Sequence, residues 1–408
     1  MASKNLPIVD WLQIESSAPA KFIISGEYSV VYEKQAIAAA IDLRTTVTIR
    51  PGKDAKLRLN LKNLNCVREW PTSSLTTCRL VSKYSECLDY NDMCPGKLSY
   101  LLNARYIVNR EQASTSRGST PSTGDSTDKD WDKKATDAVT AFLLLYIGLG
   151  DSYCSSARPP LEVDIESTIP VGSGLGSSSA YSVALCGGLM RVFRVAAEKY
   201  IISNWAFNID KFFHGRPSGV DNNVVSVGGY ILFQNGKIKA HGSAHKTPIK
   251  VMLIDTGVSR STRTLGENVL AQLRDNPAHV KEIFDNIHEI TTQIWTKLNE
   301  PDFTPRNIAD LLHRNQERLN TLGVGHEKLD DICMKAGQFN LSAKQTGAGG
   351  GGTAFVLYDD TDDCKNIEQL RKLLTDSGYH VHDHAVGCEG LSVKITPDPD
   401  KKFPIGDR

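Results

Sequence analysis

Three segments of the sequence combine residue types that could bind a phosphate group and move a proton. The first is a glycine- and serine-rich loop, Gly172-Ser-Gly-Leu-Gly-Ser-Ser-Ser179, set between a strand-like run (161–167) and a helical run (180–193). Glycine lets the backbone approach an anion closely, and the free N–H groups at a helix N-terminus carry partial positive charge. This order of strand, loop and helix favours phosphate binding over an ordinary turn with a serine cap. No Gly-Lys-Ser/Thr follows, so a phosphate-binding lysine must come from another segment.

The second segment places a carboxylate after a rigid turn. Within residues 214–222, Pro217, Ser218 and Gly219 predict a turn that presents Asp221 from a fixed backbone. An aspartate held in this way can accept a proton from a hydroxyl group. On this segment alone, an Asx-turn in which the carboxylate caps its own backbone is the favoured interpretation, and the role as proton acceptor stays open beside it.

The third segment is a run of glycines, Lys344-Gln-Thr-Gly-Ala-Gly-Gly-Gly-Gly-Thr353. It contains the GxGxxG spacing of dinucleotide-binding loops, but a strand-like run (354–358) follows where such a loop would open a helix. Four consecutive glycines therefore indicate a backbone that passes very close to a ligand or to another loop, or a flexible hairpin.

The elements that must position these segments form two predicted domains, divided at about residues 235–250. Gly26 and Glu27 mark a break after an early strand, and Asn235-Gly236 is a turn signal. In the first domain, strands are predicted at 21–25, 45–50, 161–167 and 229–233. In the second, a strand is predicted at 249–255, helices at 266–299 and 306–320, and strands at 354–358, 379–383 and 391–395.

Two neighbouring stretches of the first domain differ sharply in composition. Residues 111–134 are rich in serine, threonine and charge, which predicts a mobile surface loop inserted within the domain. The next stretch, AVTAFLLLYIGL at 138–149, is apolar but shorter than the ~20 residues that a membrane-spanning helix needs, and we expect a buried core helix. Trp205 and Phe207 are expected in the core as well.

Composition excludes several classes of function. The chain has 408 residues, enough for two or three domains, and 47 basic residues balance 47 acidic ones. Nucleic-acid binding normally needs a basic excess, and an anionic membrane surface attracts a polybasic segment, so neither partner is expected. The nine cysteines include no CxxC pair, which favours reduced thiols and a cytoplasmic location.

Two charged groups have plain structural interpretations. His380, His382 and His384 share one face of a predicted strand, but no cysteine or carboxylate completes a metal-ligand set beside them. Arg260, Arg263 and Arg274 are expected on a solvated face.

Taken together, the segments resemble the GHMP kinase superfamily and, within it, the mevalonate kinase family. The matching segments occur in family order between about residues 18 and 395. They are 18–32, 43–45, 169–182, 214–222, 255–262, 322–326 and 346–352. The resemblance implies an α+β fold of two domains. A ribosomal-S5-like ATP-binding domain would span residues 1–240, with the disordered insertion at about 111–134, and a ferredoxin-like domain would span 241–408.

The resemblance also implies a reaction and a role for individual residues. The reaction is ATP-dependent phosphorylation of the primary hydroxyl of mevalonate, with Mg²⁺ as cofactor, ATP and mevalonate as small-molecule partners, and a homodimer as one assembly that the family allows. Asp221 would be the base and Lys21 would lie beside it, while Ser178 and Asp210 would hold the metal. The phosphoryl acceptor would be recognised by Glu27, Tyr28 and Thr262. The ATP contacts would be Lys21, Asn63, Ser167, Gly172, Ser173, Gly174, Leu175, Gly176, Ser177 and Ser178.

Three positions depart from the family pattern. Ala20 replaces a glycine, Tyr28 replaces a histidine among the acceptor contacts, and Asp210 is one methylene shorter than the family's metal-binding glutamate. Two other functions stay open at this point. One is a different small-molecule kinase of the superfamily, such as a phosphomevalonate kinase, and the other is an inactive metabolite sensor on the same fold.

Overall fold

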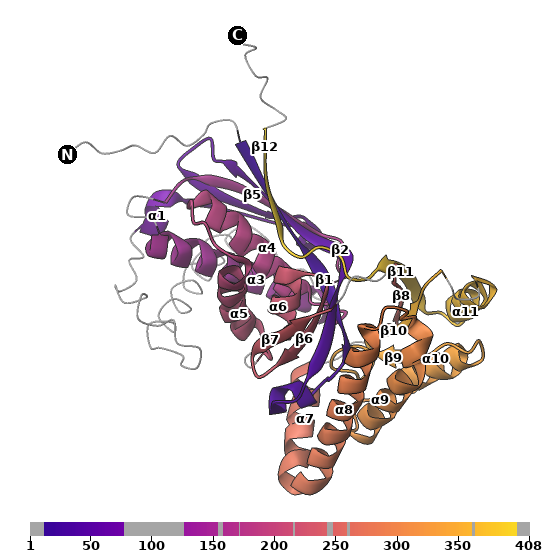
Figure 1. Cartoon of the computed structure of the whole chain (residues 1–408). Coiled ribbons are helices and arrows are strands. Elements are labelled where there is room, and N and C mark those ends of the chain that lie inside the picture. The colour runs from indigo at the N-terminus through magenta and orange to yellow at the C-terminus, as the bar shows by residue number, and fades with distance from the viewer. Residues whose placement is uncertain are drawn as a thin grey trace.

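The computed structural model describes residues 12–76, 126–153, 158–170, 172–214, 217–242, 248–258, 262–360 and 364–397. Within these residues the strands form two sheets (Figure 1). The larger sheet contains β1 (Leu12–Ser25), β2 (Ala36–Pro51), β3 (Lys56–Leu61), β4 (Cys66–Pro71), β5 (Leu161–Ser167), β6 (Tyr230–Gln234), β7 (Lys237–His241) and β12 (Ser392–Pro397). The smaller sheet contains β8 (Lys250–Asp255), β9 (Ala343–Gln345), β10 (Thr353–Tyr358) and β11 (His380–Ala385).

The long strand β2 organises the larger sheet. All six residues of its first segment, AIAAAI, are buried, whereas its second segment alternates between buried and partly exposed positions. A continuous apolar run indicates a strand covered on both faces, and three helices, α4 (Ser177–Val192), α6 (Val220–Val227) and α8 (Pro277–Leu298), contact β2. The first segment pairs with β6 and the second with β5, while β1 pairs along nearly the whole of β2. The middle of β1, which carries Lys21, therefore lies deep in the molecule.

Helices cover the larger sheet on one side (Figure 1). They are α3 (Ser126–Tyr153), α4 (Ser177–Val192), α5 (Lys199–His214) and α6 (Val220–Val227), and a short helix, α1 (Thr72–Thr76), follows β4. The apolar stretch at 138–149 lies in α3 and is largely buried, which confirms the predicted core helix. Phe142 stacks between Trp70 and Tyr146, and the rings of Trp205 and Phe207 are partly buried.

The predicted surface loop at 111–134 is wrong in its last part, because residues 126–134 form the first turns of α3. Residues 111–125 lie outside the described residues. Asp128 and Asp130 favour a helix N-terminus, and extending a helix that its apolar half already anchors costs little. Polar composition therefore did not distinguish a helical extension from a loop.

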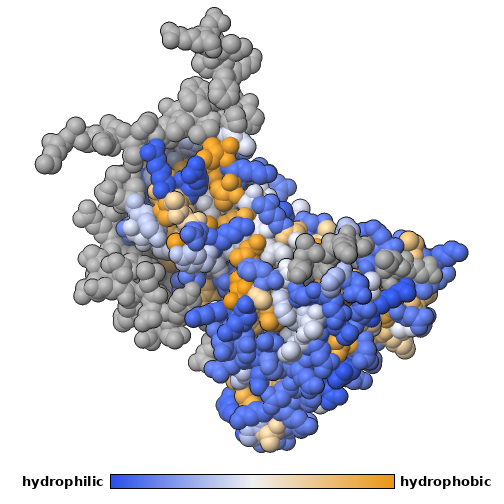
Figure 2. All heavy atoms as spheres, viewed as in Figure 1, coloured by the Kyte–Doolittle hydropathy of each residue, from blue (hydrophilic) through white to orange (hydrophobic). Residues whose placement is uncertain are grey.

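Within the described residues, the second unit combines the smaller sheet with five helices. They are α7 (Thr262–Asp275), α8 (Pro277–Leu298), α9 (Ala309–Thr321), α10 (Glu327–Gly337) and α11 (Cys364–Asp376). The single helix predicted at 266–299 is two helices, since Asn276 caps α8 by accepting a hydrogen bond from the His279 N–H and Pro277 occupies its first position. In Figure 2 this unit presents a mainly hydrophilic surface, and orange patches gather along the middle of the molecule.

The last strand returns to the larger sheet. Residues 391–395 were expected in the second domain, but β12 pairs antiparallel with β1. Arg44 holds the returning chain through hydrogen bonds to the carbonyl oxygens of Glu389 and Gly390. The alternating apolar residues predicted a strand correctly, but they carry no information about which strand it pairs with.

Candidate active site

Lys21 lies at the centre of the candidate site. Its side chain is 5% exposed, and its Nζ lies 3.1 Å from Asp221 Oδ2 and 3.1 Å from the Gly174 carbonyl oxygen. The Lys21 backbone N–H also donates to the Leu175 carbonyl oxygen at 2.9 Å. The lysine that the glycine-serine loop lacks is thus supplied by β1.

Asp221 projects from the first turn of α6. Gly219 precedes this helix with φ of 87°, a conformation that favours glycine, so the rigid turn expected before Asp221 is present. A carboxylate in the first turn is stabilised by the helix dipole. Asp221 is 38% exposed and pairs with Lys21, which matches the interpretation that its carboxylate faces a reactant.

The glycine-serine loop joins β5 to α4 as predicted. Gly172, Gly174 and Gly176 have φ of 85°, 83° and 77°, so each adopts a left-handed conformation that an L side chain would strain. Leu175 is buried beneath the loop, and Ser177 and Ser178 open α4. The N–H groups of this first helical turn thus follow directly on the two loop residues, Gly174 and Leu175, whose carbonyl oxygens bind Lys21.

Asp210, on α5, is a buried carboxylate with an unused oxygen. Its Oδ2 accepts a hydrogen bond of 2.7 Å from the Ser179 hydroxyl, and its Oδ1 has no partner among the described residues. Burial raises the pKa of Asp210 to about 8; the neighbouring charge of Asp221 adds to this, while Ser179 and Lys21 oppose it. A buried carboxylate oxygen beside serine hydroxyls is a donor set that suits Mg²⁺. Sequence reasoning missed Ser179, although it is the fourth serine of the same loop.

Asn63 and Ser167 lie together but contact none of the residues above. The Asn63 amide donates to the Ser167 carbonyl oxygen at 2.9 Å, and its oxygen accepts from the Ser167 N–H at 2.7 Å. The Ser167 hydroxyl also meets that of Thr45 at 2.8 Å. This pair joins the turn after β3 to the end of β5, immediately before the glycine-serine loop.

The three predicted acceptor contacts occupy different environments. Glu27 is buried and forms an ion pair with Lys344. Tyr28 has φ of 60°, and its hydroxyl donates to the Ala348 carbonyl oxygen at 2.5 Å. Thr262 is exposed as the first residue of α7, and residues 259–261 lie outside the described residues.

The glycine run of the second unit packs tightly. A Cβ at Gly349 would lie 2.1 Å from the Val324 carbonyl oxygen, and one at Gly351 would lie 2.6 Å from Val258 Cβ. Both glycines also have positive φ. Close approach to neighbouring loops therefore explains this run, which joins β9 to β10, better than a flexible hairpin does.

Alternate residues of this segment contact the end of β1 and the turn after it. Lys344 pairs with Glu27, Thr346 Oγ1 accepts from the Ile23 N–H at 2.8 Å, and the Ala348 carbonyl oxygen accepts from Tyr28. Farther along, Thr353 Oγ1 donates to the Ser173 carbonyl oxygen at 3.0 Å. The second unit thus contacts both the glycine-serine loop and the predicted acceptor residues. Sequence reasoning gave Lys344, Thr346 and Thr353 no role, although the period-two spacing of 344, 346 and 348 indicates a shared face.

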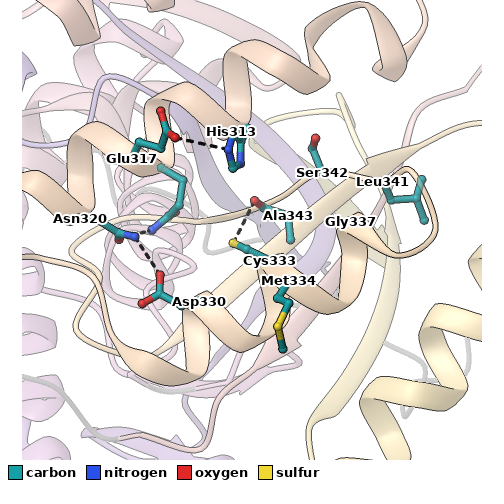
Figure 3. A pocket seen from close by; sticks show the side chains of 11 residues that line it. His313, Glu317, Asn320, Asp330, Cys333, Met334, Gly337, Leu341, Ser342 and Ala343 are labelled. Carbon is teal, nitrogen blue, oxygen red and sulfur yellow. Dashed lines mark hydrogen bonds and ion pairs between the residues drawn. The ribbon is translucent and has the colours of Figure 1, made fainter.

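A separate cavity of about 450 Å³ lies between α9, α10 and β9 (Figure 3). Its polar side chains largely bind one another: His313 pairs with Glu317, and Asn320 donates to Asp330 at 2.8 Å. None of the predicted site residues lines it. The cavity therefore lies apart from the Lys21–Asp221 pair and the glycine-serine loop.

The histidines of β11 form no metal centre within the part of the chain that the structure describes. His384 Nδ1 lies 2.9 Å from Asp42 Oδ1. Among the described residues, no helix is long and apolar enough to cross a bilayer.

Comparison with known proteins finds family matches in both units of the chain. The family models described as "GHMP kinases N terminal domain" and "GHMP kinases C terminal" match residues 138–230 and 301–379. The mevalonate kinase of Bos taurus is 33% identical over 96% of this chain and 97% of its own length. That of Homo sapiens is 30% identical over 95% of this chain and 96% of its own length. The crystal structure of L. major mevalonate kinase in complex with R-mevalonate has the same fold, with a TM-score of 0.65 at 20% identity, and covers 92% of this chain and 96% of its own.

The fold and these matches therefore define a GHMP kinase, with a family match in each of the two units of the chain. The similarity to mevalonate kinases over nearly the whole chain identifies the family within this class. The chain belongs to the mevalonate kinase family.

Proposed function

We propose that this enzyme transfers the γ-phosphoryl group of ATP to the primary hydroxyl of mevalonate, giving 5-phosphomevalonate and ADP. The observation that carries the proposal is the Lys21–Asp221 pair, 3.1 Å apart, beside the glycine-serine loop. A phosphate site, a cation and a carboxylate are the parts that phosphoryl transfer to a hydroxyl requires.

The nucleotide is held mainly by the first unit. Residues 172–178 present backbone N–H groups and serine hydroxyls to the phosphates, and the Lys21 ammonium group offsets the negative charge on the γ-phosphate. Asn63 and Ser167 contact the nucleotide where β5 leads into this loop. The left-handed glycines and the buried Leu175 hold the loop in shape before ATP binds, so little ordering is needed on binding.

Asp221 and Lys21 act on the acceptor hydroxyl. The hydroxyl proton passes to the Asp221 carboxylate, the oxygen forms a bond to the γ-phosphorus, and the bond from that phosphorus to the ADP oxygen breaks. The positive charge of Lys21 lowers the pKa of the acceptor hydroxyl and stabilises the negative charge that develops on its oxygen in this step. Glu27, Tyr28 and Thr262 recognise the rest of the acceptor.

The metal site fits Mg²⁺. Asp210 Oδ1 is a buried oxygen without a partner among the described residues, and Ser178 opens α4 one residue before Ser179, which binds Asp210. We assign Ser178 and Asp210 to the ion, and its charge would neutralise the phosphate oxygens when bound. The arm of aspartate is shorter than that of glutamate, so we expect a bridging water between Asp210 and the ion.

A coupled assay of ADP release tests the proposal. We expect ADP release with mevalonate and none above background with phosphomevalonate or galactose. ADP release with phosphomevalonate alone would support the alternative kinase, and binding of mevalonate without turnover would support the metabolite sensor. We retain the cytoplasmic location and the homodimer as predictions, and size-exclusion chromatography with light scattering tests the latter.

A further inference from the structure

Lys344 is a charged group that the proposed reaction does not use. Its side chain is completely buried, which is rare for lysine, and its ammonium group binds Glu27 Oε1 and the Gln345 carbonyl oxygen, the latter at 2.9 Å. It also lies 5.7 Å from the centre of the Phe355 ring. Lys344 belongs to the smaller sheet and Glu27 follows the first strand of the larger one, so the pair joins the two units at the site.

Glu27 has one oxygen to spare. Oε1 binds Lys344, whereas Oε2 is buried and has no hydrogen-bond partner among the described residues. A buried carboxylate oxygen without a donor is costly, so such an atom calls for an explanation. A bound hydroxyl group would supply the missing donor.

Glu27 lies within electrostatic range of Lys21. Burial raises the pKa of Glu27, and both Lys344 and Lys21 oppose that rise. Lys21 is the residue that binds Asp221, so Glu27 and Asp221 lie near the same ammonium group. An acceptor whose reactive hydroxyl meets Asp221 would therefore bring the rest of its polar groups toward Glu27.

We propose that Lys344 is a positioning residue for acceptor binding, which holds Glu27 as an oriented carboxylate so that Oε2 accepts a hydrogen bond from a hydroxyl of mevalonate. This inference rests on the proposed function. Asp221 takes the primary hydroxyl, which leaves the tertiary hydroxyl of mevalonate as the donor to Glu27. A hydrogen bond to a charged group is stronger than one between neutral groups. Loss of the Glu27 charge should therefore weaken the binding of mevalonate and leave the binding of ATP unchanged.

A double-mutant cycle over Lys344→Met, Glu27→Gln and the double variant tests the inference. The measurements are the Kd for mevalonate by calorimetry, the KM for mevalonate and for ATP, and Tm. We expect Lys344→Met and Glu27→Gln each to raise the mevalonate Kd and KM about tenfold or more, with the KM for ATP unchanged. The double variant should bind mevalonate no more weakly than Glu27→Gln, because both changes remove the same interaction.

Stability separates positioning from a merely structural ion pair. Lys344→Met leaves a buried, unpaired carboxylate and lowers Tm, whereas the double variant removes both charges and recovers much of the lost Tm. A structural pair predicts that mevalonate binding recovers together with Tm, whereas a positioning role predicts that it stays weak. Lys335→Met is the matched control, since Lys335 pairs with Asp331 on α10 of the same unit, and it should leave both KM values unchanged.

Four results would overturn the inference: unchanged mevalonate Kd in folded Lys344→Met, equal rises in the KM for ATP and for mevalonate, additive losses in the double variant, or recovery of binding with Tm. If Lys344→Met does not accumulate as folded protein, the comparison of Glu27→Gln with the double variant decides. Equal Kd values for mevalonate would support the inference, and a further fivefold loss of mevalonate affinity in the double variant would contradict it. Failure of the proposed function would show differently, as a wild-type protein that neither binds nor phosphorylates mevalonate.

Discussion

Replacing Gly176 by alanine should disable the enzyme through Lys21. A Cβ at Gly176 would lie 2.8 Å from Lys21 Cγ and 3.0 Å from Lys21 Cε, so the lysine arm must move by about 0.6 Å to reach the 3.4 Å of an ordinary contact. That arm carries the ammonium group that lies 3.1 Å from Asp221. Misplacement of a catalytic group by about 1 Å can cost about 10²-fold in rate, so we expect kcat to fall by roughly 10–100-fold.

Gly172→Ala is the matched control in the same loop. Both glycines have left-handed φ, 77° and 85°, so both substitutions carry the same backbone cost of about 1–2 kcal/mol. A Cβ at Gly172, however, meets no atom within 4 Å. We therefore expect similar losses of Tm in the two variants but a much larger fall in kcat, at saturating ATP, for Gly176→Ala. Equal falls in kcat would assign the effect to strain in the loop, and wild-type kcat in Gly176→Ala would refute the role given to Lys21.

Three further predictions concern single side chains. Asp221→Asn should fold and bind ATP normally yet lose about 10²–10⁴-fold in kcat, because it removes the proton acceptor; near-normal turnover would exclude Asp221 as the base. The pKa of Asp210 is about 8 in the folded state, whereas its ordinary value is 3.8. Between these two pH values the folded state keeps a proton that the unfolded state has lost. The free energy of unfolding should therefore fall as the pH rises from about 4 to 8, by up to about 1.4 kcal/mol per pH unit. Without divalent metal, Asp210→Asn should flatten that slope in denaturant titrations, and an unchanged slope would contradict the buried, protonated carboxyl. Asn276→Ala should lower the free energy of unfolding by about 1 kcal/mol without changing kcat, since Asn276 caps α8 far along the chain from the site, and an unaltered midpoint would count against the cap.

Local patterns in the sequence determined much of this protein. The order of strand, glycine-serine loop and helix predicted β5 and α4, because alternation and glycine conformations act within a few residues. The break at Gly26 and Glu27 and the turn before Asp221 were also predicted, for the same reason. The phosphate-binding role that we propose for the loop also rests on its own backbone and on the helix that it opens.

Other features depended on partners distant in the sequence. The pattern at 391–395 predicts a strand but cannot say that it pairs with β1, about 380 residues earlier in the chain. The start of α3 at Ser126 and the division at Asn276 were missed, because exposed helical turns and loops share polar residues and because one proline can open a helix within a continuous apolar pattern.

The charged residues of the candidate site also divide into what the sequence indicates and what only the folded chain decides. The resemblance names Lys21, Asp210 and Asp221 as candidates. Only the packing of β1, α5 and α6 brings Lys21 within 3.1 Å of Asp221 and buries Asp210. The sequence signals for Lys344 were its place beside the glycines and the period-two spacing that it shares with Thr346 and Ala348. Its importance arises because the folded chain buries it against Glu27, 317 positions away, where water no longer screens either charge.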